Sequence, residues 1–119
     1  LIDETCTRYI TEHLEGVVLE KSFNMLIAQT DGAGAELLAE KIAQVWRDLG
    51  LEVQVEECGE ELLSFRRAML PALEAKGKVL IEDVAVPISK MGEMLQALRD
   101  IESQYGIEIP TGILPEFAT

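Results

Sequence analysis

Two stretches of this sequence follow the same order of strand, helix, glycine and strand, and this internal repeat constrains the fold more than any other feature. Gly50 and Gly106 lie 56 residues apart, and the same shift carries the apolar stripe of one predicted helix onto the other. Such a stripe is typical of an amphipathic helix that buries one face. The equivalent stripe positions are Leu38 and Met94, Ile42 and Leu98, Val45 and Ile101, and Leu49 and Tyr105.

Apolar segments beside these helices predict the strands of the repeat. Phe23–Thr30 is a short apolar run that ends at a turn signal, and apolar residues alternate with polar ones in Leu51–Glu56. Val79–Pro87 is apolar on both of its faces. Ile107-Glu108-Ile109, directly after Gly106, is equivalent to Leu51-Glu52-Val53 and supplies the fourth strand. All four patterns are typical of strands. The first repeat therefore covers about residues 23–57 and the second about residues 79–110.

Two such units in tandem predict the order βαββαβ, an α+β ferredoxin-like fold with an antiparallel sheet and helices on one face. A further helix at about Glu60–Ala75 is inserted between the repeats, and another at about Asp3–Leu14 precedes them. Pro71 cannot donate a hydrogen bond to the carbonyl of Arg67, so the inserted helix should either bend there or leave that carbonyl free for another partner. The chain is long enough for one core, and we expect a single domain over residues 1–119.

The charge balance excludes several classes of partner. The chain carries 22 acidic and 10 basic residues, a formal net charge of −12, and its only adjacent basic pair is Arg66 and Arg67. Nucleic acids and anionic lipid surfaces require clustered basic residues, which this sequence lacks. No apolar run approaches the ~20 residues of a membrane span. Cys6 and Cys58 form no CxxC pair, and they predict free buried thiols in a cytoplasmic protein.

Arg66 is the candidate binding residue. It follows Leu62 by four residues and therefore lies beside the apolar stripe of the inserted helix. Its planar guanidinium suits bidentate recognition of a carboxylate, so Arg66 could hold a small acidic substrate. The alternatives are a structural ion pair with one of the many acids, or a side chain whose stem covers apolar surface while its charge stays in water.

The remaining polar motifs predict less chemistry. Glu82 and Asp83 are neighbours on one predicted strand, so their side chains point to opposite faces and cannot form a catalytic carboxylate pair. Asp31–Glu36 (DGAGAE) matches neither a dinucleotide-binding fingerprint nor a P-loop, which favours a plain turn. His13 is the only histidine, so histidine-based metal sites and nucleophile systems lack a second member. We therefore assign no catalytic residue and no metal ligand, and the sequence leaves the cofactor-binding residues unknown.

Two local patterns resemble the C-terminal domain of FAD-linked 2-hydroxy-acid oxidases of the glycolate oxidase and D-lactate dehydrogenase type. In that family a helix of the form LWxxRxxxxxAL precedes a strand like LEDVxVP and a long helix that ends in YG. Here LLSFRRAMLPAL places Arg66 at the family arginine and Leu63 where a tryptophan usually stands. IEDVAVP at Ile81–Pro87, followed later by Tyr105-Gly106, matches the rest of the pattern.

The resemblance implies a function and its partners. The family's substrate domain caps a flavin, and a hydride passes from the α-carbon of a 2-hydroxy acid to the flavin ring. Arg66 is similar to an arginine that binds the substrate carboxylate. The resemblance implies FAD in the parent enzyme, with none expected on this chain alone. The implied partner is an FAD-binding domain of the same enzyme or of an adjacent subunit.

The sequence departs from the family after the second helix. The family motif GHAGDGNxH, whose histidines bind metal or take a proton beside the flavin, is replaced by IPTGILPEFAT. We therefore expect a domain fragment that is inactive alone, and a chain that starts at Leu1 without a methionine fits this expectation. The alternative is a non-catalytic ferredoxin-like regulatory or assembly module that dimerises through its sheet face. The sequence leaves open the particular 2-hydroxy acid, the electron acceptor and the oligomeric state.

For such a fragment, the purified chain should show neither flavin absorbance nor dehydrogenase activity toward glycolate or D-lactate. The physical reason is that hydride transfer requires both a positioned flavin and a base, and these residues predict neither. Absorbance spectra and a dehydrogenase assay measure the two properties. Flavin bound at one-to-one stoichiometry would contradict the prediction.

Overall fold

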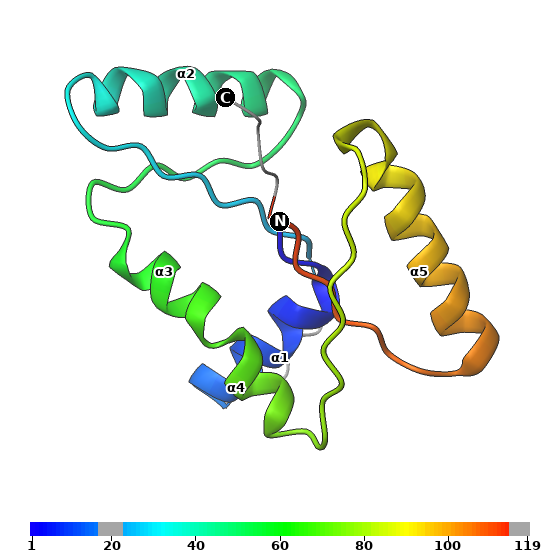
Figure 1. Ribbon diagram of the computed structural model, residues 1–119. Helices are drawn as coiled ribbons and strands as arrows, with labels where there is room; N and C mark the ends of the chain where they lie inside the picture. The colour runs from blue at the N-terminus through cyan, green and yellow to red at the C-terminus, as the bar shows by residue number, and fades with distance from the viewer. Residues whose placement is uncertain (17–22, 115–119) are drawn as a thin grey trace. The chain divides into compact units, whose positions relative to one another are not determined.

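The computed structural model describes residues 1–16 and 23–114. The chain divides into two compact units, one formed by Leu1–Leu26 with Phe65–Thr119 and the other by Ile27–Ser64. No helix in the described part of the chain has the length and hydrophobicity needed to span a membrane. The elements in chain order are α1 (Glu4–Glu15), α2 (Ala35–Asp48), α3 (Glu60–Arg67), α4 (Met69–Glu74), the one-turn helix η1 (Ile88–Lys90) and α5 (Met91–Tyr105) (Figure 1).

Helix α1 is capped at both ends by its own sequence. At its start, the Asp3 side chain accepts a hydrogen bond of 2.9 Å from the backbone N–H of Cys6, which satisfies a donor that has no partner within the helix. At its end, Gly16 adopts a left-handed conformation with a φ of 68° and donates to the carbonyl of Glu12. The helix expected at about Asp3–Leu14 is confirmed.

The core of the first unit lies where α1 packs against α4. Its apolar centre contains Cys6, Ile10 and Ala72, and none of these exposes more than 1% of its surface. Burial of a side chain of the size of isoleucine contributes about 1.5–3 kcal/mol. Thr7 and Thr11 are buried beside them, and their hydroxyls donate to backbone carbonyls at 2.6 to 3.0 Å. These buried polar groups are therefore satisfied.

Two helices, α3 and α4, occupy the range 60–75 for which the sequence predicts one bent helix. The break falls at Ala68, between Arg67 and Met69. Pro71 explains it, because a proline has no N–H to donate to the Arg67 carbonyl and the chain cannot continue as one regular helix. The predicted bend is confirmed.

Helices α2 and α5 confirm the helical part of the repeat. Gly50 follows α2 with a φ of 83°, and Gly106 caps α5 with a φ of 64°. Both angles lie in the left-handed region, which glycine adopts without strain. The N–H of Gly106 donates to the carbonyl of Glu102, as in common helix C-caps. Glycines 56 residues apart therefore end two equivalent helices.

Strand pairing in the described residues is limited to bridges made by the N-terminal segment. Ile2 forms isolated antiparallel bridges to Met25 and to Gly112. The Ile2 N–H donates to the Met25 carbonyl at 2.8 Å, and the Met25 N–H donates back at 2.9 Å. Leu1 and Ile113 exchange a similar pair of backbone hydrogen bonds, of 2.9 and 2.8 Å. Three segments that are far apart in the sequence are thus joined at one residue.

The predicted ferredoxin-like antiparallel sheet is wrong, because residues 1–16 and 23–114 contain no strand beyond these bridges. Val79–Pro87 has no ladder partner there, and Leu80, Ile81 and Val84 are 84%, 61% and 70% exposed. An apolar pattern shows which side chains suit a pleated surface, but a strand forms only where another backbone supplies hydrogen bonds. The short N-terminal segment supplies them only at isolated positions. The sheet face expected to mediate dimerisation is therefore not formed by these residues.

Arg99 of α5 binds both the N-terminal segment and the segment after α5. One guanidinium nitrogen lies 2.8 Å from the Asp3 carboxylate, and another donates to the Ile109 carbonyl at 2.7 Å and to the Thr111 hydroxyl at 3.1 Å. The Arg99 Nε lies 2.5 Å from the Glu102 carboxylate and forms an ion pair with it. The Nε–H does not point at the carboxylate oxygen, so the pair contains no hydrogen bond. The Asp3 side chain is only 5% exposed, so its charge depends on this partner.

Replacing Arg99 with methionine should lower the free energy of unfolding by about 2–4 kcal/mol, because the buried Asp3 carboxylate loses its cation. Urea denaturation followed by circular dichroism measures the loss. Lys90→Met is the control, since the ion pair of Lys90 with Glu93 is exposed on both sides and such pairs contribute less than about 1 kcal/mol. Equal losses in the two variants would contradict a central role for Arg99.

Both cysteines are free, but only one of them is buried as predicted. Cys6 lies in the core, where burial and then the nearby Asp3 carboxylate raise the pKa of its thiol. Cys58 is exposed in the polar segment before α3, so the prediction of a buried thiol is wrong there.

A thiol reagent at about pH 8 should label Cys58 quickly and Cys6 only after unfolding, because the Cys6 thiol is enclosed and stays protonated. The raised pKa of Cys6 contributes to the stability of the folded chain. This contribution is complete at pH values below about 8.5, the pKa of an unfolded cysteine, and declines as the pH rises above that value. Mass spectrometry counts the labels, and Cys58→Ser should take none while folded. Two labels on the native chain would show that Cys6 is accessible.

Candidate functional site

Arg66 lies in the last turn of α3 with its side chain exposed. Burial, and then the charge of Arg66, lower the pKa of the Leu1 amino group. The side chain of Met69, at the start of α4, packs against Gly112. A Cβ atom added to Gly112 would lie only 3.3 Å from the Met69 Cε. Arg66 thus belongs to the same unit as the N-terminal segment.

The Arg66 guanidinium forms no hydrogen bond or ion pair with any residue that the structure describes. The structural ion pair considered as an alternative is thus not made within residues 1–16 and 23–114. Arg99 shows the contrast, since its guanidinium is occupied by two carboxylates, a carbonyl and a hydroxyl. Arg66 keeps its N–H donors available, and a guanidinium in that state suits a carboxylate ligand.

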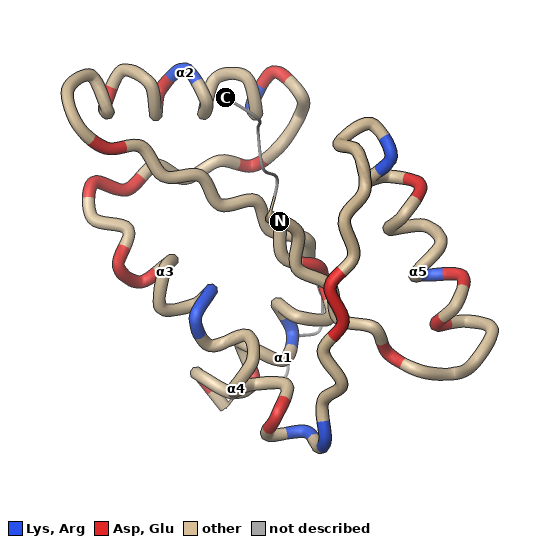
Figure 2. Tube along the Cα trace, in the orientation of Figure 1, with Lys and Arg blue, Asp and Glu red and all other residues tan. Residues whose placement is uncertain are grey.

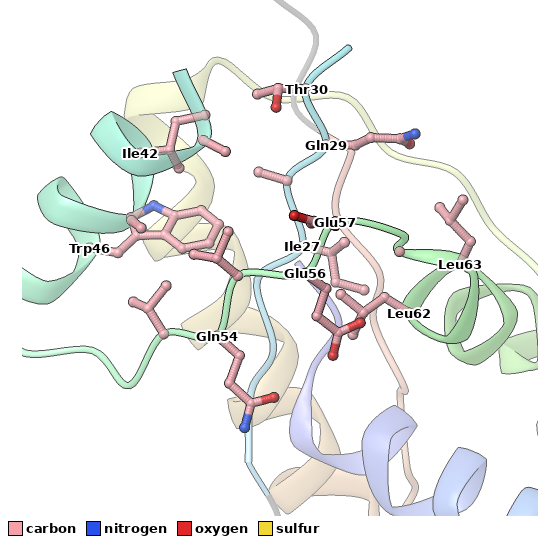
Figure 3. A pocket seen from close by; sticks show the side chains of 16 residues that line it. Ile27, Gln29, Thr30, Ile42, Trp46, Gln54, Glu56, Glu57, Leu62 and Leu63 are labelled. Carbon is pink, nitrogen blue, oxygen red and sulfur yellow. The ribbon is translucent and has the colours of Figure 1, made fainter. Parts of the chain in front are cut away.

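A separate cavity of about 150 Å³ lies within the unit Ile27–Ser64 (Figure 3). Its walls come from residues 27–30, from the face of α2 that carries Ile42 and Trp46, and from residues 53–57 with the first turn of α3. Figure 3 shows the indole ring of Trp46 extending from α2 toward the segment that carries Glu56 and Glu57. Arg66 does not line this cavity, so the structure does not bring the predicted residue to it.

Sequence reasoning missed this cavity. The alternation in Leu51–Glu56 indicates a strand with one wet face, and a paired strand would have filled the space beside α2. The structure leaves that segment unpaired, and the inner face of α2 is only partly covered. The usable signal was the stripe of α2 itself, because it places Ile42 and the single tryptophan, Trp46, on one face.

Neither the turn before α2 nor the cavity fits a flavin dinucleotide. The Gly32 and Gly34 turn leads into the N-terminus of α2, where backbone N–H groups favour anions, but Asp31 and Glu36 place carboxylates before and after it. The cavity of about 150 Å³ is smaller than the ~300–1,000 Å³ of ordinary ligand pockets. Within the described ranges, no group of three or more histidine, cysteine or acidic side chains could hold a metal. We therefore derive no cofactor chemistry from these residues.

Comparison with known proteins identifies a family. The family described as FAD linked oxidases, C-terminal domain, matches residues 1–112 of the 119. Curated proteins and solved structures gave no match. The matched range contains Arg66, Ile81–Pro87 and Tyr105-Gly106, the places on which the resemblance rests. The resemblance is confirmed at the level of the FAD-linked oxidase C-terminal domain, and the glycolate oxidase or D-lactate dehydrogenase subtype stays a prediction.

Proposed function

We propose a substrate-binding role in 2-hydroxy-acid oxidation for this chain, which belongs to the family of C-terminal domains of FAD-linked oxidases. Membership makes the chain part of an oxidoreductase whose parent enzyme contains FAD, and it makes an FAD-binding domain its partner. In that enzyme the chain binds glycolate, D-lactate or a related 2-hydroxy acid. It is inactive without its partner.

The observation that carries this proposal is that the Arg66 charge has no partner within residues 1–16 and 23–114. A 2-hydroxy acid is an anion at neutral pH, and a chain with a net charge of −12 repels it unless a cation is available. Within the described residues, Arg66 is exposed and has no carboxylate partner. A bidentate contact would satisfy both the guanidinium and the substrate carboxylate.

The reaction divides between this chain and its partner. The redox chemistry belongs to the flavin of the parent enzyme, and no step of it is assigned to this chain. Arg66 acts on the substrate by holding its carboxylate, which fixes the position of the neighbouring α-carbon and its hydroxyl. No base that takes the hydroxyl proton is assigned among these residues, because they carry no histidine motif.

The cellular setting is part of the same proposal. Cys6 and Cys58 are free, and free thiols suit the reducing conditions of the cytoplasm. We therefore place the enzyme there. A homodimer stays a prediction, and no surface is assigned to it.

Calorimetric titration of the purified chain with glycolate and with D-lactate tests the proposal. Arg66→Ala should weaken binding at least about tenfold, because a charge-assisted contact contributes roughly 1.5–3 kcal/mol. Arg66→Lys should recover part of the affinity, since lysine keeps the charge without the planar fork.

Arg47→Ala is the matched control for this titration. Arg47 is also an exposed arginine in the last turn of a helix, and the nearest carboxylate, that of Glu40, lies 3.9 Å away. This variant should bind both acids like the unchanged chain. The proposal fails if the unchanged chain binds neither acid, or if Arg66→Ala and Arg47→Ala behave alike.

A further inference from the structure

The cavity in the unit Ile27–Ser64 has the size of a site for a small organic ligand. Its volume is about 150 Å³. An engineered apolar cavity of about 150 Å³ in another protein is large enough to bind benzene. All of the residues that line the cavity belong to this one unit, so its geometry is that of a single compact body.

The walls of the cavity combine an aromatic face with apolar side chains. Trp46 is half-buried and contributes its indole ring, and Ile27, Ile42 and Leu62 contribute aliphatic surface. Such walls favour a ligand with an apolar exterior. A tryptophan face also attracts cations more strongly than the other aromatic side chains do.

The charged groups at the cavity are all negative. Glu56 and Glu57 line it, and no lysine, arginine or histidine does. Neither carboxylate has a hydrogen bond or ion pair within the described residues. Figure 2 shows acidic positions along the segment between α2 and α3, and residues 49–59 contain no basic residue.

We propose that this cavity binds an organic ammonium ion whose alkyl groups contact Trp46 and the aliphatic walls while its charge faces Glu57. The ring face and the carboxylate both favour a cation, and the net charge of −12 raises the local concentration of cations. An inorganic cation fits less well, because it requires a shell of oxygen ligands and this cavity is mostly apolar. An anion is repelled.

This site is independent of the function proposed for Arg66. The cavity excludes the anionic 2-hydroxy acids that Arg66 is proposed to hold, and Arg66 does not line it. Substitution of Arg66 should therefore leave binding in the cavity unchanged, and substitution of Glu57 should leave binding of 2-hydroxy acids unchanged. The two proposals can fail separately.

Tryptophan fluorescence tests the proposal, because Trp46 is the only tryptophan of the chain. Choline chloride is the probe, and the controls are potassium chloride at equal ionic strength and the neutral isostere of choline in which carbon replaces nitrogen. Choline should change the Trp46 emission along a saturable curve, and its half-saturation should lie roughly fivefold or more below that of the isostere. Potassium chloride should produce no saturable change.

Two variants locate the charge that the ligand recognises. Glu57→Gln should weaken choline binding roughly fivefold, because it removes the facing charge and keeps the shape. Glu52→Gln, on the same segment but outside the cavity lining, should leave it unchanged. Circular dichroism checks that both variants are folded. Equal affinities for choline and its isostere, equal effects of the two substitutions, or the absence of saturable binding would each overturn the proposal.

Discussion

The ion pair between Asp3 and Arg99 is the interaction on which the first unit depends. One carboxylate oxygen of Asp3 accepts from the Cys6 N–H and caps α1, and the other accepts from the Arg99 guanidinium. Arg99 in turn binds the Ile109 carbonyl and the Thr111 hydroxyl. A single buried carboxylate therefore positions the start of α1, the middle of α5 and the segment that follows α5. The bridges made by Ile2 lie immediately beside it and rely on the same alignment.

The excess of acidic residues gives the few arginines distinct uses. Arg99 is surrounded by acceptors and serves the fold, whereas Arg66 meets no acceptor in the described residues and is open to a ligand. The cavity beside Trp46 is the opposite case, since its charged lining groups are carboxylates. The same acid excess leaves Arg66 without a carboxylate partner in the described residues and gives the cavity a negative lining.

The sequence predicted the local features and the family, but not the pairing of distant segments. The stripes that end at Gly50 and Gly106 predicted α2 and α5, and Pro71 predicted the break between α3 and α4. Helices can be predicted in this way because their hydrogen bonds are local. The sheet was predicted wrongly because a strand depends on a distant partner that its own pattern does not identify. The unpaired state of Arg66 was beyond prediction for the same reason, since no pattern tells which of 22 acids lies near it.

The exposed segment Val79–Pro87 has a consequence for how the chain survives before it meets its partner domain. Short apolar runs with unpaired backbone are the places where two copies of a protein can join edge to edge and begin to aggregate. Glu82 and Asp83 interrupt this run at its centre, and both are exposed. In an antiparallel pairing of two copies centred on them, carboxylates would face carboxylates and oppose association. Two adjacent carboxylates at the centre of an unpaired apolar segment therefore disfavour edge-to-edge pairing of two copies.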